Sequence, residues 1–187
     1  KTRIIAQRQQ IVRVDREAGS DLELQLSKRL TKSIEKGLSK SKAIVIGDYG
    51  KGVITQDFLN KLKQLKKQHS AWLSFDPKPV HSLDLSELSL VTPNRKEAFE
   101  LAGICDSTKK TNPLKDKNLI RVAKKLIDKL GLKILLITLG ELGMLICQPG
   151  KKEFHIPTLA IVWAENTQVF HDSNAIVIRI RLGHKYS

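Results

Sequence analysis

Cysteine is scarce in this chain: the 187 residues include two, Cys105 and Cys147, and they match no metal-binding or redox spacing. We therefore expect two reduced thiols, as is usual in the cytoplasm. Aromatic residues make up only 5% of the chain, so a core must be built mainly from Ile, Leu, Val and Ala. No apolar run approaches the ~20 residues that span a bilayer, and the N-terminal segment lacks the apolar stretch of a signal peptide. These absences predict a cytoplasmic globular protein with no membrane as partner.

Acidic residues are outnumbered, with 19 Asp and Glu against 33 Lys and Arg, which leaves a formal net charge of +14. Nucleic acid is a weak candidate partner, because no nucleic-acid-binding motif is present and no aromatic residues are interleaved with the lysines to stack on bases. The lysines alternate with apolar residues at helical spacing, which is typical of solvated helix faces. The lysine-rich segments are 28–42, 61–68, 109–118 and 124–129. A non-catalytic basic α/β module that binds RNA or an anionic surface is the alternative interpretation.

Stretches typical of strands alternate with stretches typical of helices along the chain. Period-two or continuous apolar runs predict strands, and apolar residues three and four apart predict helices. The predicted strands are two within 3–15, then 43–48, 71–76, 88–94, 133–140 and 144–148, with a further alternating stretch at 175–182. The predicted helices are 21–38 with Asp21 as its cap, 55–68 opening at Thr55, 95–103 and 117–130. This alternation predicts an α/β fold with a largely parallel sheet flanked by helices.

Polar side chains stand just past the carboxyl ends of four predicted strands. They are Asp48, Asp76, Asn94 and Thr138. In open α/β sheets, ligands bind at this edge. The sequence therefore predicts a small-molecule site there.

Asn94 and Glu97 have a spacing that supports two interpretations. An Asn at a strand end followed three residues later by Glu can form a capping box at the start of a helix. Alternatively, both side chains point into the ligand edge, where the Glu97 carboxylate holds Mg²⁺, directly or through water, beside phosphate oxygens. Spacing alone leaves both interpretations open.

Two lysines are placed where they could meet an anion. Lys51 lies between two glycines in the turn after a strand, where backbone N–H groups can approach a phosphate, although the GxxxxGK[ST] motif is absent. Lys78 follows Asp76 and Pro77, and the proline forces an extended turn that presents the lysine at the same edge. An ordinary strand-to-helix turn at Lys51 and a solvated lysine at Lys78 are the simpler alternatives.

Thr138, Gly140 and Gly143 form a tight strand–turn–strand segment. Its glycines permit either close approach to a flat ligand such as adenine or a plain hairpin. His155 has no partner at metal-ligand spacing, so we interpret it as structural or solvated.

Taken in order, these segments resemble the ribokinase (PfkB) family, and most closely its heptose-7-phosphate kinase branch. The matching segments are TRIIAQRQQIVRVDRE (2–17), IGDYGKGVIT (46–55), FDPKP (75–79), LVTPNRKEAFE (90–100), ITLGELGMLICQPG (137–150) and HIPTLA (155–160). Thr-Pro-Asn-x-x-Glu is specific to the family, and the arginine-rich 3–15 segment points to the heptose kinase branch.

The resemblance implies transfer of the γ-phosphate of ATP, with Mg²⁺, to the anomeric hydroxyl of heptose 7-phosphate in ADP-heptose and lipopolysaccharide core synthesis. The implied partners are a sugar phosphate and a nucleotide, and a homodimer is compatible with it. The implied site residues are Asn94 and Glu97 for Mg²⁺ and phosphate, Thr138, Gly140 and Gly143 for nucleotide, and Lys51, Asp76 and Lys78 for the reacting phosphates or sugar.

Two departures from the family pattern bear on activity. The family's N-terminal sugar-binding strand, with its Asp and Gly-Gly-Asn, has no counterpart here. In the family's Gly-Ala-Gly-Asp element the Asp is the general base. When Ala164-Glu165-Asn166-Thr167 is aligned with the family's Ala-Gly-Asp-Thr, both glycines are lost and Asn166, which cannot accept a proton, stands at the base position. We therefore predict a partial ribokinase-like kinase domain over 1–160 and a divergent or altered-frame tail over 161–187. We also predict that the chain is inactive, or nearly so, as an enzyme.

Overall fold

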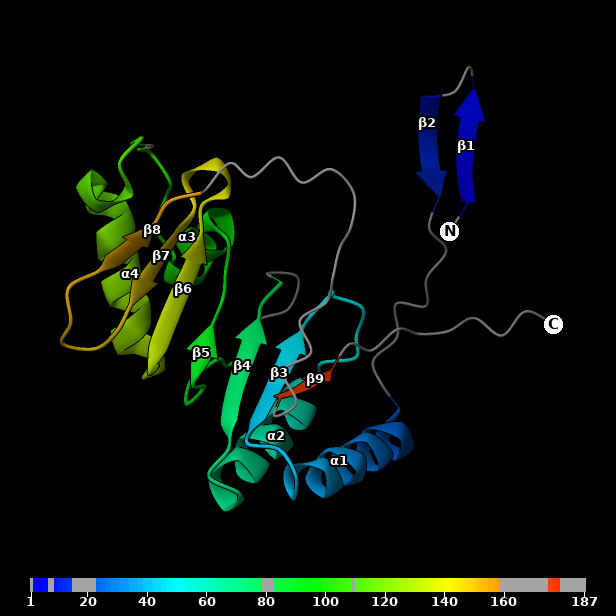
Figure 1. Ribbon diagram of the computed structural model, residues 1–187. Helices are drawn as coiled ribbons and strands as arrows, with labels where there is room; N and C mark the ends of the chain where they lie inside the picture. Colours follow the sequence, from blue (N-terminus) through cyan, green and yellow to red (C-terminus); the bar gives the residue numbers. More distant parts are fainter. Residues whose placement is uncertain are drawn as a thin grey trace.

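The computed structural model describes residues 2–6, 9–14, 23–78, 83–108, 110–158 and 175–178. Its main feature is a seven-stranded sheet in the order β8-β7-β6-β5-β4-β3-β9, with helices packed along it (Figure 1). The strands of this sheet are β3 (Ala43–Gly47), β4 (Trp72–Asp76), β5 (Leu90–Val91), β6 (Ile134–Thr138), β7 (Met144–Cys147), β8 (Phe154–Ile156) and β9 (Ala175–Ile178). The helices are α1 (Leu24–Leu38), α2 (Gln56–Gln68), α3 (Arg95–Ala102) and α4 (Lys117–Leu130).

The sheet is parallel from β9 to β6 and antiparallel at β7 and β8. Helices connect the parallel strands: α2 joins β3 to β4, and α3 and α4 lie between β5 and β6. On the sheet, α2 packs against β4, while α4 packs against β6 and β7. The prediction of a largely parallel α/β sheet flanked by helices is confirmed.

The core consists of aliphatic side chains from both layers, as the low aromatic content predicted. The parallel strands β3, β4, β5 and β6 contribute fully buried residues, and so do the inner faces of α2 and α4. Examples are Ile44, Ile46, Leu73, Val91, Leu135 and Ile137 from strands, with Leu59, Leu62, Leu119 and Leu126 from helices. Two phenylalanines, Phe58 on α2 and Phe75 on β4, fill the largest volumes. This packing holds the carboxyl ends of the parallel strands in one edge.

The two strands predicted within 3–15 are confirmed as β1 (Thr2–Ala6) and β2 (Gln9–Val14). They pair antiparallel in a two-stranded sheet of their own, which lies away from the main sheet (Figure 1).

Three sequence-based predictions differ from the structure. The first helix begins at Leu24 after Glu23, which makes no side-chain cap, and the predicted cap Asp21 lies outside the described residues. The strand predicted at 88–94 is regular only over Leu90–Val91, because Pro93 has no N–H to donate to a ladder. Lys63 is buried rather than solvated, because its ammonium donates to the backbone and side-chain oxygens of Asp84.

The alternating stretch at 175–182 is confirmed as a strand over Ala175–Ile178, which pairs parallel with β3. The rest of the segment after Thr158 lies outside the described residues. The division of the chain at Ala160 therefore stays a prediction. Among the helices that the structure describes, none has the length and apolar character to cross a membrane.

Candidate functional site

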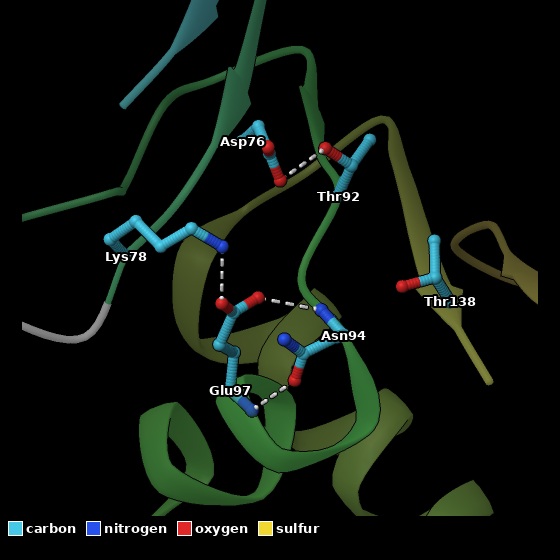
Figure 2. A pocket seen from close by; sticks show the side chains of 6 residues that line it. All are labelled: Asp76, Lys78, Thr92, Asn94, Glu97 and Thr138. Atoms are coloured by element: carbon cyan, nitrogen blue, oxygen red, sulfur yellow. Dashed lines mark hydrogen bonds and ion pairs between the residues drawn. The ribbon is translucent and has the colours of Figure 1, made fainter. Parts of the chain in front are cut away.

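A pocket of about 410 Å³ opens at the carboxyl edge of the parallel strands. Figure 2 shows the side chains that line it, which are Asp76, Lys78, Thr92, Asn94, Glu97 and Thr138. Three of the four residues predicted at this edge from the strand ends line the pocket together. Three of the polar strand ends therefore meet in one pocket, and the binding of a small molecule there stays a prediction.

Backbone hydrogen bonds between neighbouring strand ends bring these residues together. The Asp48 N–H donates to the Asp76 carbonyl at 3.1 Å, and the Thr138 N–H donates to the Pro93 carbonyl at 3.0 Å. Asn94 also forms an isolated parallel bridge with Thr138. The parallel ladder thus continues one step past the regular strands, which fixes the spacing of the pocket floor.

Asn94 and Glu97 form a complete capping box at the start of α3. The Asn94 side chain accepts from the Glu97 N–H at 2.9 Å, and the Glu97 carboxylate accepts from the Asn94 N–H at 2.8 Å through Oε2. The structural interpretation of this spacing is confirmed. The capping box leaves the second interpretation open, in which Glu97 faces a ligand. The box holds the Glu97 carboxylate at the pocket wall, where the side chain is 6% exposed.

Lys78 reaches the same carboxylate from the loop after β4. Its Nζ donates to Glu97 Oε1 at 2.8 Å, and the lysine side chain is 38% exposed. The hydrogen bond to Glu97 raises the pKa of Lys78 above its ordinary value, and the charges of Asp76 and Asp48 act in the same direction. The lysine predicted as a solvated loop residue or a phosphate ligand is therefore an ion-pair partner inside the pocket.

Asp76 lies at the rim of the pocket and accepts from the Thr92 hydroxyl at 3.3 Å. Burial among neighbouring atoms raises the pKa of Asp76, while Lys78 and Thr92 lower it; Glu97 and Asp48 add to the rise. The net upward shift of the Asp76 pKa reflects mainly its burial, which outweighs the lowering by Lys78 and Thr92.

Asp48 is the one of the four polar strand-end residues to which the family resemblance assigned no role, and it is absent from the described pocket lining. It is 3% exposed, its Oδ1 accepts from the Gly50 N–H at 2.9 Å, and its Oδ2 has no hydrogen-bond partner. Burying a carboxylate oxygen without a hydrogen-bond donor costs free energy, and a ligand hydroxyl or a cation at this oxygen would offset that cost. The signal was present in the sequence, because Asp48 ends a continuous apolar strand.

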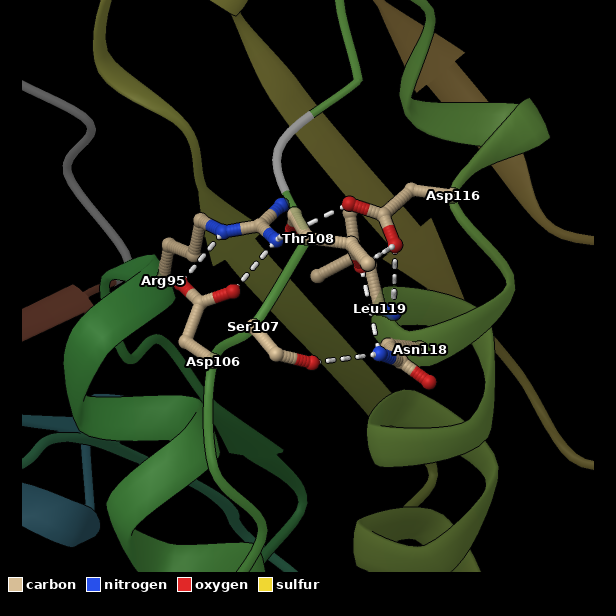
Figure 3. Close-up of polar contacts among 7 residues, drawn as sticks. All are labelled: Arg95, Asp106, Ser107, Thr108, Asp116, Asn118 and Leu119. Carbon is tan, nitrogen blue, oxygen red and sulfur yellow. Dashed lines mark hydrogen bonds and ion pairs between the residues drawn. The ribbon is translucent and has the colours of Figure 1, made fainter.

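A second polar network fixes α3 from its other side (Figure 3). Arg95, the first residue of α3, forms a bidentate pair with Asp106, with both N···O distances at 2.7 Å. It also donates to the backbone oxygen of Thr108 and, at 2.9 Å, to Asp116. Its guanidinium lies over the Phe99 ring at 4.9 Å from the centroid. Sequence spacing gave no hint of this network, since Arg95 and Asp116 are far apart in the chain.

Asp116 is the point where this network meets α4. Its side chain is 0% exposed, and it caps α4 by accepting from the Leu119 N–H at 3.2 Å. Burial by itself would raise the pKa of Asp116, but the Leu119 N–H and the Arg95 guanidinium outweigh it, so the pKa falls below its ordinary value. Arg95 thus joins the amino ends of α3 and α4, and the Asn94–Glu97 capping box sits at the joined end.

The hairpin interpretation of the 138–143 segment is confirmed: a 3₁₀ turn over Gly140–Leu142 joins β6 to the antiparallel β7. Gly143 has a φ of 83°, and a Cβ there would stand 2.0 Å from the Ile156 carbonyl oxygen. His155 contacts the Leu142 carbonyl at 2.6 Å, which fits the structural role predicted for it. Contact of Thr138, Gly140 and Gly143 with a nucleotide stays a prediction.

The structure does not connect Lys51 or Asn166 with this pocket. Lys51 is exposed on the loop after β3 and is absent from the described pocket lining. Asn166, at the aligned base position, lies outside the described residues. A role for either residue stays a prediction.

The pocket suits a magnesium ion that is held mainly by water and phosphate. Within the described ranges, no three Asp, Glu, His or Cys side chains converge closely enough to hold a metal by themselves. Mg²⁺ commonly takes one or two carboxylates and completes its shell with waters and substrate phosphates. Glu97, fixed at the pocket wall by the capping box, fits that minimal role.

The strand order and the polar pocket at the carboxyl edge define an α/β protein of the ribokinase-like fold. Solved structures share this fold: phosphofructokinase-2 from Escherichia coli matches with a TM-score of 0.61 at 17% identity, over 75% of this chain and 44% of that one. Ribokinase from Giardia lamblia matches with a TM-score of 0.57 at 25% identity, over 72% of this chain and 41% of that one. The chain belongs to the pfkB family of carbohydrate kinases, whose sequence profile matches residues 1–167.

Curated relatives with similar sequences carry the name bifunctional protein HldE. The one from Desulfatibacillum aliphaticivorans is 31% identical over 94% of this chain and 33% of its own length. The one from Aliarcobacter butzleri is 34% identical over 78% of this chain and 29% of its own length. The chain therefore spans about a third of the length of these relatives.

Proposed function

We propose that this chain forms the nucleotide- and phosphate-binding part of a kinase that phosphorylates the anomeric hydroxyl of heptose 7-phosphate. The observation that supports the proposal most directly is the pocket in which Lys78 and Glu97 meet at the end of the parallel sheet. Phosphoryl transfer needs a positive group and a cation-binding carboxylate close together, since its catalysis is largely positioning and charge stabilisation. The similarity to HldE proteins supports the heptose branch, whose product would feed ADP-heptose and lipopolysaccharide core synthesis.

Each residue has a role in this proposal that follows from its position. Glu97 orients the hydration shell of a phosphate-bound cation, and Lys78 neutralises phosphate oxygens. Asp76 at the pocket rim accepts a hydrogen bond from a sugar hydroxyl, and the unpartnered Oδ2 of Asp48 is a further acceptor at the same sheet edge. When bound, Mg²⁺ would stabilise the negative charge on the phosphate oxygens of ATP. The turn after Thr138 borders the nucleotide, and Lys51 meets the sugar phosphate from the loop after β3.

We also propose that the chain as given turns over very slowly. Asn166 cannot act as a general base, which contributes about 10²–10⁴-fold in typical enzymes. Loss of the glycines around it removes a preorganised anion hole, worth about 10²–10³-fold more. We expect binding of nucleotide to survive, since Lys78 and Glu97 are present.

An ADP-release assay with Mg-ATP and heptose 7-phosphate tests both parts. The HldE protein from Aliarcobacter butzleri should form heptose 1,7-bisphosphate, whereas this chain should stay at least about 10⁴-fold below the 1–100 s⁻¹ typical of kinases. If the relative phosphorylates no sugar phosphate, the substrate assignment is wrong. If this chain turns over in the usual kinase range, the assignment of Asn166 to the base position is wrong.

Calorimetric titration with ADP tests the binding part independently of turnover. Glu97→Gln should weaken ADP binding in the presence of Mg²⁺, because the carboxylate acts through the cation. Metal-free ADP binding should not weaken, because the loss of the carboxylate charge leaves Lys78 available to the phosphates. Glu100→Gln, on the exposed side of the same helix, is the matched control. Sedimentation of the same samples tests the predicted homodimer.

A further inference from the structure

Both oxygens of the Glu97 carboxylate already accept hydrogen bonds from the chain itself. The Asn94 N–H on Oε2 is part of the capping box, so it stays in place as long as α3 is formed. The Lys78 ammonium on Oε1 comes from a side chain that is 38% exposed, on a loop beyond the end of β4. Of these two hydrogen-bond donors, only Lys78 can leave the Glu97 carboxylate without a change in the fold.

The surroundings of Lys78 require a positive charge. The ammonium contacts the Glu97 carboxylate at 2.8 Å and shares the pocket lining with Asp76. The charges of Glu97, Asp76 and Asp48 all favour the charged form of Lys78 and raise its pKa. Glu97 is 6% exposed and Asp48 is buried with one oxygen unpartnered, so water screens these negative charges poorly. Because the described residues include no set of three metal ligands, the pocket has no strong chelating site of its own, and Lys78 supplies the positive charge.

We propose that Lys78 is the resident counter-cation of Glu97, and that a divalent cation must displace the Lys78 ammonium from Oε1 to bind. A free cation then gains little, because it leaves the ammonium without a partner beside a second positive charge. A cation that arrives with phosphate groups brings an anion for the displaced lysine. The ion pair therefore favours the cation–nucleotide complex over the free cation. This inference deepens the proposed function, on which it rests for the identity of the anion.

Binding of Mn²⁺ alone, followed by electron paramagnetic resonance on the full chain, tests the displacement. Lys78→Met should tighten Mn²⁺ binding about ten-fold or more, since a charge within ~4–6 Å shifts such an equilibrium by one to three decades. Lys96→Met removes the same charge from the exposed face of α3, where Lys96 pairs with Glu100 at 3.8 Å. The Lys96 variant should change Mn²⁺ binding less than about two-fold, because exposed charges are screened.

ADP binding without metal gives the opposite shift. Lys78→Met should weaken it about ten-fold, because the anion loses its ammonium partner. If Lys78 had only a structural role, its loss would weaken Mn²⁺ and ADP binding together. Opposite shifts therefore distinguish the proposed counter-cation role from a structural one. Glu97→Gln added to Lys78→Met should abolish the gain in Mn²⁺ affinity.

Lys78→Gln covers the case in which the methionine variant does not fold. Glutamine still donates a hydrogen bond to Glu97 but has no charge, so Mn²⁺ binding should again tighten. Unchanged or weaker Mn²⁺ binding in the folded Lys78 variants overturns the proposal. Neither probe contains a sugar, so a failure of the heptose kinase assignment leaves this result intact, and the reverse also holds.

Discussion

Replacing Arg95 by methionine should destabilise the fold more than any other single change in the network that joins α3 to α4. The substitution leaves Asp116, whose side chain is 0% exposed, without its cationic partner. Breaking a buried pair by removing one partner costs about 3–5 kcal/mol. Two features reduce that figure: Asp116 keeps its hydrogen bonds from the Leu119 N–H and the Thr108 hydroxyl, and methionine still packs on Phe99. We therefore expect a loss of about 2–4 kcal/mol in the free energy of unfolding.

Urea unfolding of the full chain, followed by circular dichroism, measures this loss. The midpoint should fall with an unchanged m-value, and Tm should drop by roughly 5–12 °C. Asp106→Asn is the control. It removes the other carboxylate that pairs with Arg95, but position 106 is 35% exposed, so water can replace the lost interaction. That variant should lose less than about 1 kcal/mol.

The pH dependence gives a sharper check on the same reasoning. The pKa of Asp116 in the folded protein lies below its ordinary value of 3.8. A lowered carboxylate pKa contributes stability that is present above 3.8 and is lost as the pH falls through the folded value. The difference between wild type and Arg95→Met should thus be largest near neutral pH and shrink as the pH falls below 3.8. A loss below about 1 kcal/mol at neutral pH, or a difference independent of pH, would refute the argument.

Three further outcomes follow from single positions. Gly143→Ala should cost more than about 2 kcal/mol in a urea titration, because its Cβ would stand 2.0 Å from a backbone oxygen of β8, whereas Gly140→Ala, with open space around it, should cost about 1 kcal/mol; equal losses would contradict this. In native protein at pH 8, mass spectrometry should find the exposed Cys105 labelled by iodoacetamide and Cys147 unlabelled, because burial raises the pKa of Cys147 to about 12; labelling of Cys147 before unfolding would count against its burial. Thr55→Ala should cost about 1 kcal/mol in the same urea titration, because its hydroxyl accepts an N–H at the start of α2, and no loss would show that the cap is dispensable.

The sequence by itself determined the local structure wherever the signal is local. Thr55 caps α2 as predicted, and Asp48, Asp76 and Thr138 end or follow strands as their apolar runs indicated. Strand periodicity, helix spacing and caps depend on neighbours a few residues apart, so one chain segment carries the information. The convergence of the polar strand ends followed from the same patterns, because parallel strands share one carboxyl edge.

Only the tertiary structure decided which of two local interpretations holds, and what each polar group meets. Spacing could not tell whether Glu97 caps a helix or faces a pocket; it does both, because β4 and α3 bring Lys78 to its free oxygen. The pairing of Arg95 with Asp116 likewise joins segments that are distant in sequence, and the burial of Asp48 with one unpartnered oxygen appears only in the packed structure. Side chains that are far apart along the chain come into contact only in the packed sheet. These contacts determine which charged groups face one another in the pocket.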